Sequence, residues 1–124
     1  MKEYIDEDLV IYTSLIKERV AEICEVRETS YLIRFMNGNF AKVTSKEIKP
    51  IPLTTDILEK NGWKNDKGDY INDRYHLHLC GKYDEYSVYR VVNDNNVVWL
   101  TCVRNVSDLQ HLFFGLGLNP EMEV

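Results

Sequence analysis

A proline-containing stretch near the middle of this sequence limits what the chain can fold into more than any other feature. Pro50 and Pro52 lie one residue apart, and proline fits neither the interior of a helix nor a central strand, so the segment has to be extended. Thr54 or Thr55 offers a hydroxyl that can cap a helix, and Gly62 suits the position just beyond its end. The stretch therefore predicts an extended strap that leads into a two-turn helix.

The segment before the strap is rich in β-forming residues and short turns. Its β-branched and aromatic runs predict four strands, and the second needs a bulge because its apolar residues recur every third position. These strands are predicted at residues 8–12, 17–27, 31–36 and 40–43. Asn37-Gly38 lies between the last two, where it predicts a type I′ hairpin. Residues 1–49 are therefore predicted to form a small, curled, SH3-like β half.

Residues 50–124 are predicted to form a second, α+β half, although the sequence also allows both halves to share one compact unit. The clearest strand alternation in the chain places Arg74, His76, His78 and Cys80 on one face. Two more β runs follow and complete an antiparallel meander.

A last helix is predicted over residues 107–116, with Asn105 or Ser107 as its cap. Its apolar residues have the i, i+3, i+4, i+7 spacing of an amphipathic helix: Leu109, Leu112, Phe113 and Leu116. We expect this stripe to cover the meander.

The composition is that of a soluble globular protein, with 44% hydrophobic and 28% charged residues. No apolar run approaches the roughly 20 residues that cross a bilayer, and the acidic first residues do not resemble a secretory signal. Cys24, Cys80 and Cys102 form an odd number without framework spacing, which indicates a reducing compartment. We therefore expect a cytoplasmic protein with no membrane partner.

The charge pattern disfavours nucleic acid as a partner, but nucleic-acid binding stays an alternative function. The net charge is −5, whereas nucleic-acid-binding domains usually carry a dense basic face. Lysines around the strap nevertheless give that region a small basic surplus, and those of the SH3-like half are Lys42, Lys46 and Lys49. Phosphate contacts through these lysines are one alternative function.

His76, His78 and Cys80 form the one metal-like grouping in the sequence. Alternate residues of a strand share a face, and imidazole and thiolate are good zinc or copper ligands. The spacing matches no usual structural zinc pattern, so a polar sheet face is the simpler interpretation and a metal site is a second alternative.

Catalytic motifs are missing from the sequence. Cys80 could be combined with His78 or His111 and with Asp84, but none of them lies in a nucleophile elbow or glycine-rich loop. We therefore expect neither an enzyme nor a cofactor.

Aromatic residues supply the candidate protein-binding surface. Tyrosines concentrate between residues 70 and 89, where strand packing explains most of them, but Tyr and Trp are also enriched at interface hot spots. Tyr83, Tyr86 and Phe114 are the candidates. Phe114 lies beside the apolar stripe of the last helix, where it packs against the β half or meets another chain.

The strap and the last helix resemble a known pattern. Residues 50–54, 57–58 and 61–63 resemble a "PIPLT…IL…NGF" block, and residues 106–114 resemble the "VHQLQNLYFAL" block that ends such chains. Both blocks occur in small proteins that prophages and mobile elements of gut bacteria carry. Ser107-Asp108 replaces the usual His-Gln, and Gly115-Leu116-Gly117 replaces the usual ending. The resemblance implies no activity. Together these features predict a non-enzymatic phage or mobile-element protein that binds a host or phage protein.

Overall fold

The computed structural model describes residues 4–13, 18–82, 85–94 and 96–124, and the chain divides into two compact units. Unit 1 contains Met1–Ile51 and Asn105–Glu121, and unit 2 contains Pro52–Arg104 and Met122–Val124. The first division falls two residues beyond the boundary expected from the sequence. Residues 105–121, which we expected in the second half, belong instead to unit 1.

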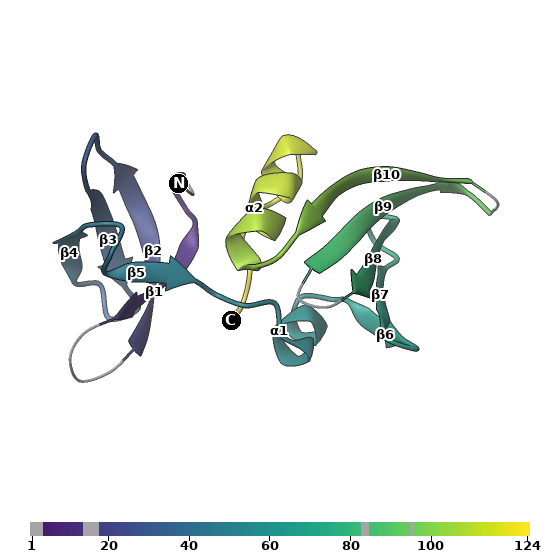
Figure 1. Ribbon diagram of the computed structural model, residues 1–124, viewed down its shortest axis with the longest axis horizontal. Helices are drawn as coiled ribbons and strands as arrows, with labels where there is room; N and C mark the ends of the chain where they lie inside the picture. Colours follow the sequence, from purple (N-terminus) through teal and green to yellow (C-terminus); the bar gives the residue numbers. More distant parts are fainter. Residues whose placement is uncertain (1–3, 14–17, 83–84, 95) are drawn as a thin grey trace. The chain divides into compact units, whose positions relative to one another are not determined.

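Unit 1 is built on a five-stranded antiparallel sheet with the order β4-β3-β2-β1-β5 (Figure 1). Its strands are β1 (Leu9–Thr13), β2 (Glu18–Val26), β3 (Tyr31–Phe35), β4 (Phe40–Val43) and β5 (Ile48–Pro50). The predicted bulge is confirmed, because the register with β3 shifts between Ile23 and Glu25. The predicted hairpin is also present, but its turn is not type I′. Only Gly38 of the Asn37-Gly38 pair has positive φ, and its N–H donates to the Phe35 carbonyl, which is the geometry of a three-residue loop.

The sheet of unit 1 curls, because a tight turn joins its two edge strands. The Glu47 N–H donates to the Thr44 carbonyl at 3.1 Å, which brings the end of β4 close to the start of β5. Thr13 at the end of β1 in turn donates to the Glu47 carbonyl at 2.8 Å. Curling encloses a core that includes Val10, Ile23, Ile33, Phe35, Val43 and Ile48, with Tyr4 beside it. The curled antiparallel sheet agrees with the sequence, which predicted four of its five strands and missed β5, and the SH3-like assignment stays a prediction.

Unit 2 is a meander of five antiparallel strands in the order β10-β9-β8-β7-β6. They are β6 (Lys64–Asp66), β7 (Asp69–Asn72), β8 (Leu77–Lys82), β9 (Glu85–Asn93) and β10 (Asn96–Val103). The helix α1 (Thr55–Lys60) precedes them, with Thr54 as its N-cap and Gly62 at a φ of 86° just after its end, as the sequence predicted. The buried side chains of unit 2 include Leu58, Trp63, Leu77, Leu79 and Val88.

The long strand expected from Arg74 to Cys80 is shorter than predicted. Residues 73–76 form a turn, in which the Tyr75 N–H donates to the Asn72 side chain at 3.3 Å and His76 has a φ of 56°. A strand residue needs negative φ, so β8 begins at Leu77. The alternation in the sequence is real, but the Asn72 side chain competes for the backbone and ends the pattern early.

Helix α2 (Val106–Gly115) has the predicted cap, since the Asn105 side chain accepts from the Asp108 N–H at 2.9 Å. Its buried residues differ from the predicted stripe: Val106, Ser107, Leu109, Gln110 and Phe113 are buried, whereas Leu112 and Leu116 are partly exposed. The helix belongs to unit 1, where the Val106 N–H donates to the Ile51 carbonyl and α2 contacts β1. The expectation that α2 covers the meander is therefore corrected. Neither helix of the described residues could cross a membrane.

Candidate functional site

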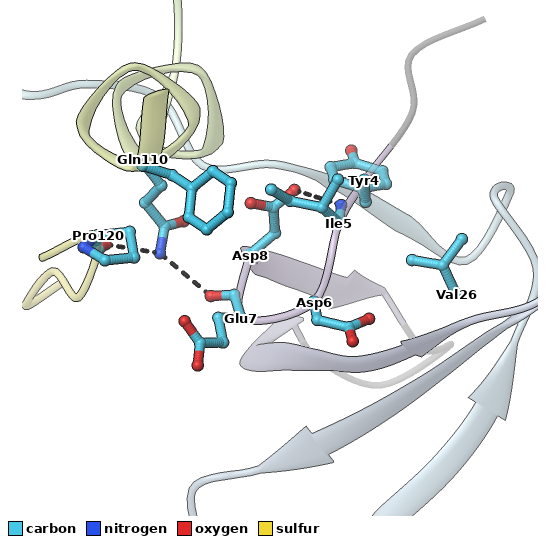
Figure 2. A pocket seen from close by; sticks show the side chains of 9 residues that line it. Tyr4, Ile5, Asp6, Glu7, Asp8, Val26, Gln110 and Pro120 are labelled. Carbon is cyan, nitrogen blue, oxygen red and sulfur yellow. Dashed lines mark hydrogen bonds between the residues drawn. The ribbon is translucent and has the colours of Figure 1, made fainter. Parts of the chain in front are cut away.

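A cavity of about 660 Å³ lies in unit 1, between the segment that precedes β1 and helix α2 (Figure 2). Its lining consists of five consecutive residues, 4–8, together with Val26 from β2, Gln110 and Phe114 from α2, and Pro120 from the tail. This volume falls within the range of ligand pockets in proteins, roughly 300–1,000 Å³. Among the described residues of the lining, none is a lysine or an arginine.

The buried side chain of Gln110 holds the walls of the cavity together. Its Oε1 accepts from the Leu9 N–H at 2.9 Å, and its Nε2 donates to the carbonyls of Glu7 and Pro120, both at 3.1 Å. Figure 2 shows the amide reaching from α2 to the N-terminal segment and the tail. A single side chain thus satisfies three backbone groups from two separate segments, which fixes α2, residues 7–9 and Pro120 in one arrangement.

The N-terminal segment enters the sheet through a strained residue. Glu7 has a φ of 74°, a left-handed conformation that costs a non-glycine residue about 1 kcal/mol or more. The conformation is retained because both backbone groups of Glu7 are bonded: its N–H donates to the Ile23 carbonyl at 2.7 Å, and its carbonyl accepts from Gln110. The kink leaves the side chains of Asp6 and Glu7 exposed.

Buried Asp8 pairs with the partly exposed His111 at the base of this segment. The Asp8 side chain is 1% exposed, and its Oδ2 lies 2.7 Å from Nε2 of His111 and accepts from the Ile5 N–H at 2.9 Å. A carboxylate that orients an imidazole is also part of catalytic triads. The nearest hydroxyl on the same helix, Ser107, donates to the Asn105 side chain at 2.9 Å. The pair therefore serves to anchor the N-terminal segment on α2.

Negative charge gathers around the cavity. Burial raises the pKa of Tyr4 above its ordinary value, and the neighbouring Tyr31 and the carboxylates of Asp8 and Asp108 raise it further. Burial likewise raises the pKa of the Cys24 thiol, Arg34 partly offsets this increase, and Glu22 and Asp6 add to it. Among the described residues, neither Asp6 nor Glu7 has an ion-pair partner.

A second candidate surface lies on the sheet of unit 2. Paired residues of neighbouring strands share a face, and the register aligns Ile71 with His78, His78 with Tyr89, and Tyr89 with Trp99. These four residues, the aromatic row, cross β7, β8, β9 and β10. Trp99 is 56% exposed and the other three are partly exposed, so the row faces solvent.

The apolar character of this face continues toward the β9–β10 turn. Val97 pairs with Val91 on the same face as the aromatic row and is exposed. The opposite face of the sheet carries the buried Leu77, Leu79 and Val88. The sheet therefore has one core face and one open face, and the open face is unusually apolar near β10.

The predicted aromatic candidates do not form one surface. Tyr83 lies outside the described residues. Tyr86 is on the core face, where its ring lies over Gly81 and contacts the Tyr70 ring edge-on at 6.0 Å. Burial and then Tyr70 raise its pKa. Phe114 is 66% exposed and belongs to unit 1, where it lines the cavity instead of packing into the β half.

The lysines named for nucleic acid lie around the turn between β4 and β5. Lys42 is exposed on β4, Lys46 is exposed in the turn, and Lys49 is exposed on β5. Lys49 is paired with Glu18, which reduces the positive charge of this region. Of the three lysines, Lys42 and Lys46 have no ion-pair partner among the described residues. Two such charges are few for a phosphate-binding surface.

The structure separates the three metal candidates. His78 and Cys80 share a face of β8, but His76 is in the preceding turn with positive φ. Burial and the Asp69 carboxylate raise the pKa of Cys80, which disfavours the thiolate form that binds metals. The described part of the chain holds no group of three or more potential metal-binding side chains. The described structure therefore does not gather these three side chains into one group, and the metal alternative stays a prediction.

Sequence reasoning missed Trp99, Val97 and Ile71 on the open face, and Asp8 and Gln110 beside the cavity. The open face could have been found by carrying the alternation of Leu77–Cys80 through to residues 97–99, because antiparallel pairing keeps alternate residues on one face. Nothing local marks Gln110, since its partners Leu9 and Glu7 lie more than 100 residues away in sequence and Pro120 lies beyond the end of the helix.

Comparisons with protein-family models, with curated proteins and with solved structures give no match to this chain.

Proposed function

We propose that this chain is a non-enzymatic binding protein that docks another protein on the open face of the unit 2 sheet. The aromatic row carries the proposal. Ile71, His78, Tyr89 and Trp99 lie side by side across four strands on a face that the described structure leaves exposed. Tyr and Trp are enriched in protein interface hot spots, and truncating one hot-spot residue costs ~2 kcal/mol or more of binding free energy.

The shape and composition of the face support a protein as the occupant. The row offers a mostly apolar strip, bordered by exposed charged residues: Lys64 on β6, and Asp66 and Asp69 at the β6–β7 turn. An apolar centre with a charged rim is the usual anatomy of a protein interface. Aromatic sheet faces also stack nucleic acid bases, but those faces are accompanied by positive charge, and this chain has a net charge of −5.

The proposed origin in a prophage or mobile element rests on the sequence blocks at residues 50–63 and 106–114. It is consistent with a small binding protein, and it predicts that the docked protein comes from the host or the phage.

The test compares two exposed aromatic residues. Tagged wild-type protein, Trp99→Ser and Phe40→Ser are each used to capture proteins from host lysate treated with nuclease. Phe40 is the matched control because it is 60% exposed on a strand of unit 1. The captured protein is then purified and its Kd is measured for all three. We expect Trp99→Ser to weaken binding about 30-fold or more, and Phe40→Ser to leave it unchanged.

Two outcomes would contradict the proposal. Equal affinity of the Trp99→Ser protein for the purified partner would show that the open face is not the docking surface. Capture that disappears on nuclease treatment and falls steeply with salt would instead favour nucleic acid bound through Lys42 and Lys46.

A further inference from the structure

The cavity of unit 1 has no role in the proposed docking, which uses the other unit. Its walls combine two kinds of chemistry. Ile5, Val26, Phe114 and Pro120 supply apolar surface, and Asp6 and Glu7 supply exposed carboxylates. A ligand complementary to both has an apolar body and a positive charge.

The apolar part of the cavity is open enough to receive a ligand. Phe114 presents 66% of its surface, Val26 45% and Ile5 41%, although all three line a concave region. An exposed ring is also a good partner for a cation held by nearby carboxylates. Phe114 is on the same helix as Gln110, so its backbone position is fixed by the hydrogen bonds that close the walls.

The charged part favours a cation. Asp6 and Glu7 are exposed and have no ion-pair partner among the described residues, and the described part of the lining contains no lysine or arginine. Burial is the main cause of the raised pKa of Tyr4, and Asp8 and Asp108 add smaller contributions of the same sign. A metal ion is a poor candidate, because these carboxylates do not gather into a metal-binding group in the described structure.

The walls are also built before any ligand arrives. Gln110 joins three backbone groups, and the Asp8–His111 pair adds a second link between the same segment and α2. Preorganised walls reduce the ordering cost of binding. At about 660 Å³ the cavity exceeds what one side chain of a docked protein would fill, and it suits a small molecule.

We infer that the unit 1 cavity binds a small organic cation, a protonated amine carried on an apolar or aromatic body. The ammonium group lies toward Asp6 and Glu7, and the apolar body contacts Phe114, Val26 and Ile5. Neutral and anionic molecules of the same shape are bound less well, because they gain nothing from the carboxylates or are repelled by them.

Three probes of one shape test the inference: 2-phenylethylamine, 2-phenylethanol and 3-phenylpropionate. Each is titrated into ¹⁵N-labelled full-length protein at pH 7 and low salt, and amide shifts are followed by NMR. We expect the amine to shift the amides of residues 4–8, 26 and 114, with an affinity at least fivefold higher than that of the alcohol. The propionate should cause no saturable shift, and the amine affinity should fall as salt screens the carboxylates.

Variants separate the charge from the fold. Asp6→Asn/Glu7→Asn removes both charges, and asparagine tolerates the left-handed conformation of residue 7. Phe114→Ala removes an exposed ring. Glu59→Gln/Asp66→Asn makes the same change of net charge on exposed residues of unit 2 and is the control. We expect the first two variants to weaken amine binding about fivefold or more, and the control to leave it unchanged.

Equal affinity for the amine and the propionate would overturn the inference, as would unchanged amine binding in the Asp6→Asn/Glu7→Asn protein with a wild-type melting temperature. Neither result bears on the docking face of unit 2, which the Trp99→Ser comparison tests separately.

Discussion

The two units of this protein are both built on five antiparallel strands, but the strands are connected in different orders. In unit 1 the fifth strand returns to pair with the first, and a four-residue turn joins the two edge strands, so the sheet curls around its core. In unit 2 each strand pairs only with its neighbours in sequence, so the sheet ends at β6 and β10. The curled sheet of unit 1 encloses its core, whereas the described meander of unit 2 has one core face and one exposed face.

The difference also decides where binding features arise. The cavity of unit 1 is lined mainly by irregular backbone outside the sheet, residues 4–8 and the tail at Pro120, and the buried amide of Gln110 joins its walls. The aromatic row of unit 2 is made by regular pairing and needs no special backbone. Substitution of a single buried polar residue should therefore reduce the stability of unit 1, whereas substitutions on the open face of unit 2 should leave its stability nearly unchanged.

Truncation of helix α2 should have the largest effect on stability. Phe113 is 6% exposed, whereas Leu112 is partly exposed on the same helix. We expect Phe113→Ala to reduce the free energy of unfolding by about 3–5 kcal/mol and Leu112→Ala by clearly less. Urea denaturation followed by circular dichroism measures both. Equal losses would mean that the predicted stripe through Leu112, and not the observed one, is the buried face.

Removal of the Gln110 amide should have the next largest effect. Gln110→Ala leaves the Leu9 N–H and the carbonyls of Glu7 and Pro120 without their partner, which should cost about 2–4 kcal/mol. Amide hydrogen exchange should show Leu9 losing protection, while the amides of β8 and β9 keep theirs. Uniform loss across both units would contradict the division drawn here.

A change inside the core face of unit 2 should cost less. A Cβ added at Gly81 would lie 2.8 Å from Cε1 of Tyr86, so Gly81→Ala should cost about 1–3 kcal/mol because the ring has to move. In the Tyr86→Ala background the same change should cost much less, and thermal melts of the four proteins give the coupling energy. An additive pair would show that the ring does not lie over Gly81.

Substitution on the open face should have the smallest effect. Trp99→Ser should change the free energy of unfolding by about 0.5 kcal/mol or less, since the side chain is 56% exposed. The same denaturation experiment measures it, with Phe40→Ser as the matched change in unit 1. A loss of more than 2 kcal/mol would mean that Trp99 is part of a core and not of a docking face.

Local patterns in the sequence were sufficient for most elements. The caps Thr54 and Asn105, the bulge in β2 and the strap all follow from short-range chemistry, and all are present. The prediction of a strand beginning at Arg74 was wrong, because the Asn72 side chain accepts from the Tyr75 N–H and starts a turn. The alternation of residue types does not reveal this local competition for the backbone. The predicted type I′ turn at Asn37-Gly38 was also wrong. The loop has a third residue, and a three-residue loop needs positive φ only at Gly38.

The unit on which α2 packs could not be predicted from the sequence. The spacing of Leu109 and Phe113 shows that α2 packs on something, but not on which unit, because either sheet offers apolar surface. Hydrogen bonds of Gln110 and His111 hold α2 in unit 1. Their partners Glu7, Asp8 and Leu9 lie more than 100 residues away in sequence. A polar residue in a helical stripe gives no indication of its partners, so neither the cavity nor the placement of α2 could be derived.

The central claim, an open apolar face on unit 2, is tested most directly by tryptophan fluorescence. The chain has two tryptophans, of which Trp63 is 2% exposed and Trp99 is 56% exposed. Acrylamide quenching of the wild type should reveal one accessible and one protected emitter, and Trp99→Phe should remove the accessible, red-shifted one. If the emission lost in Trp99→Phe is instead blue-shifted and protected from acrylamide, the face is covered and the account is wrong.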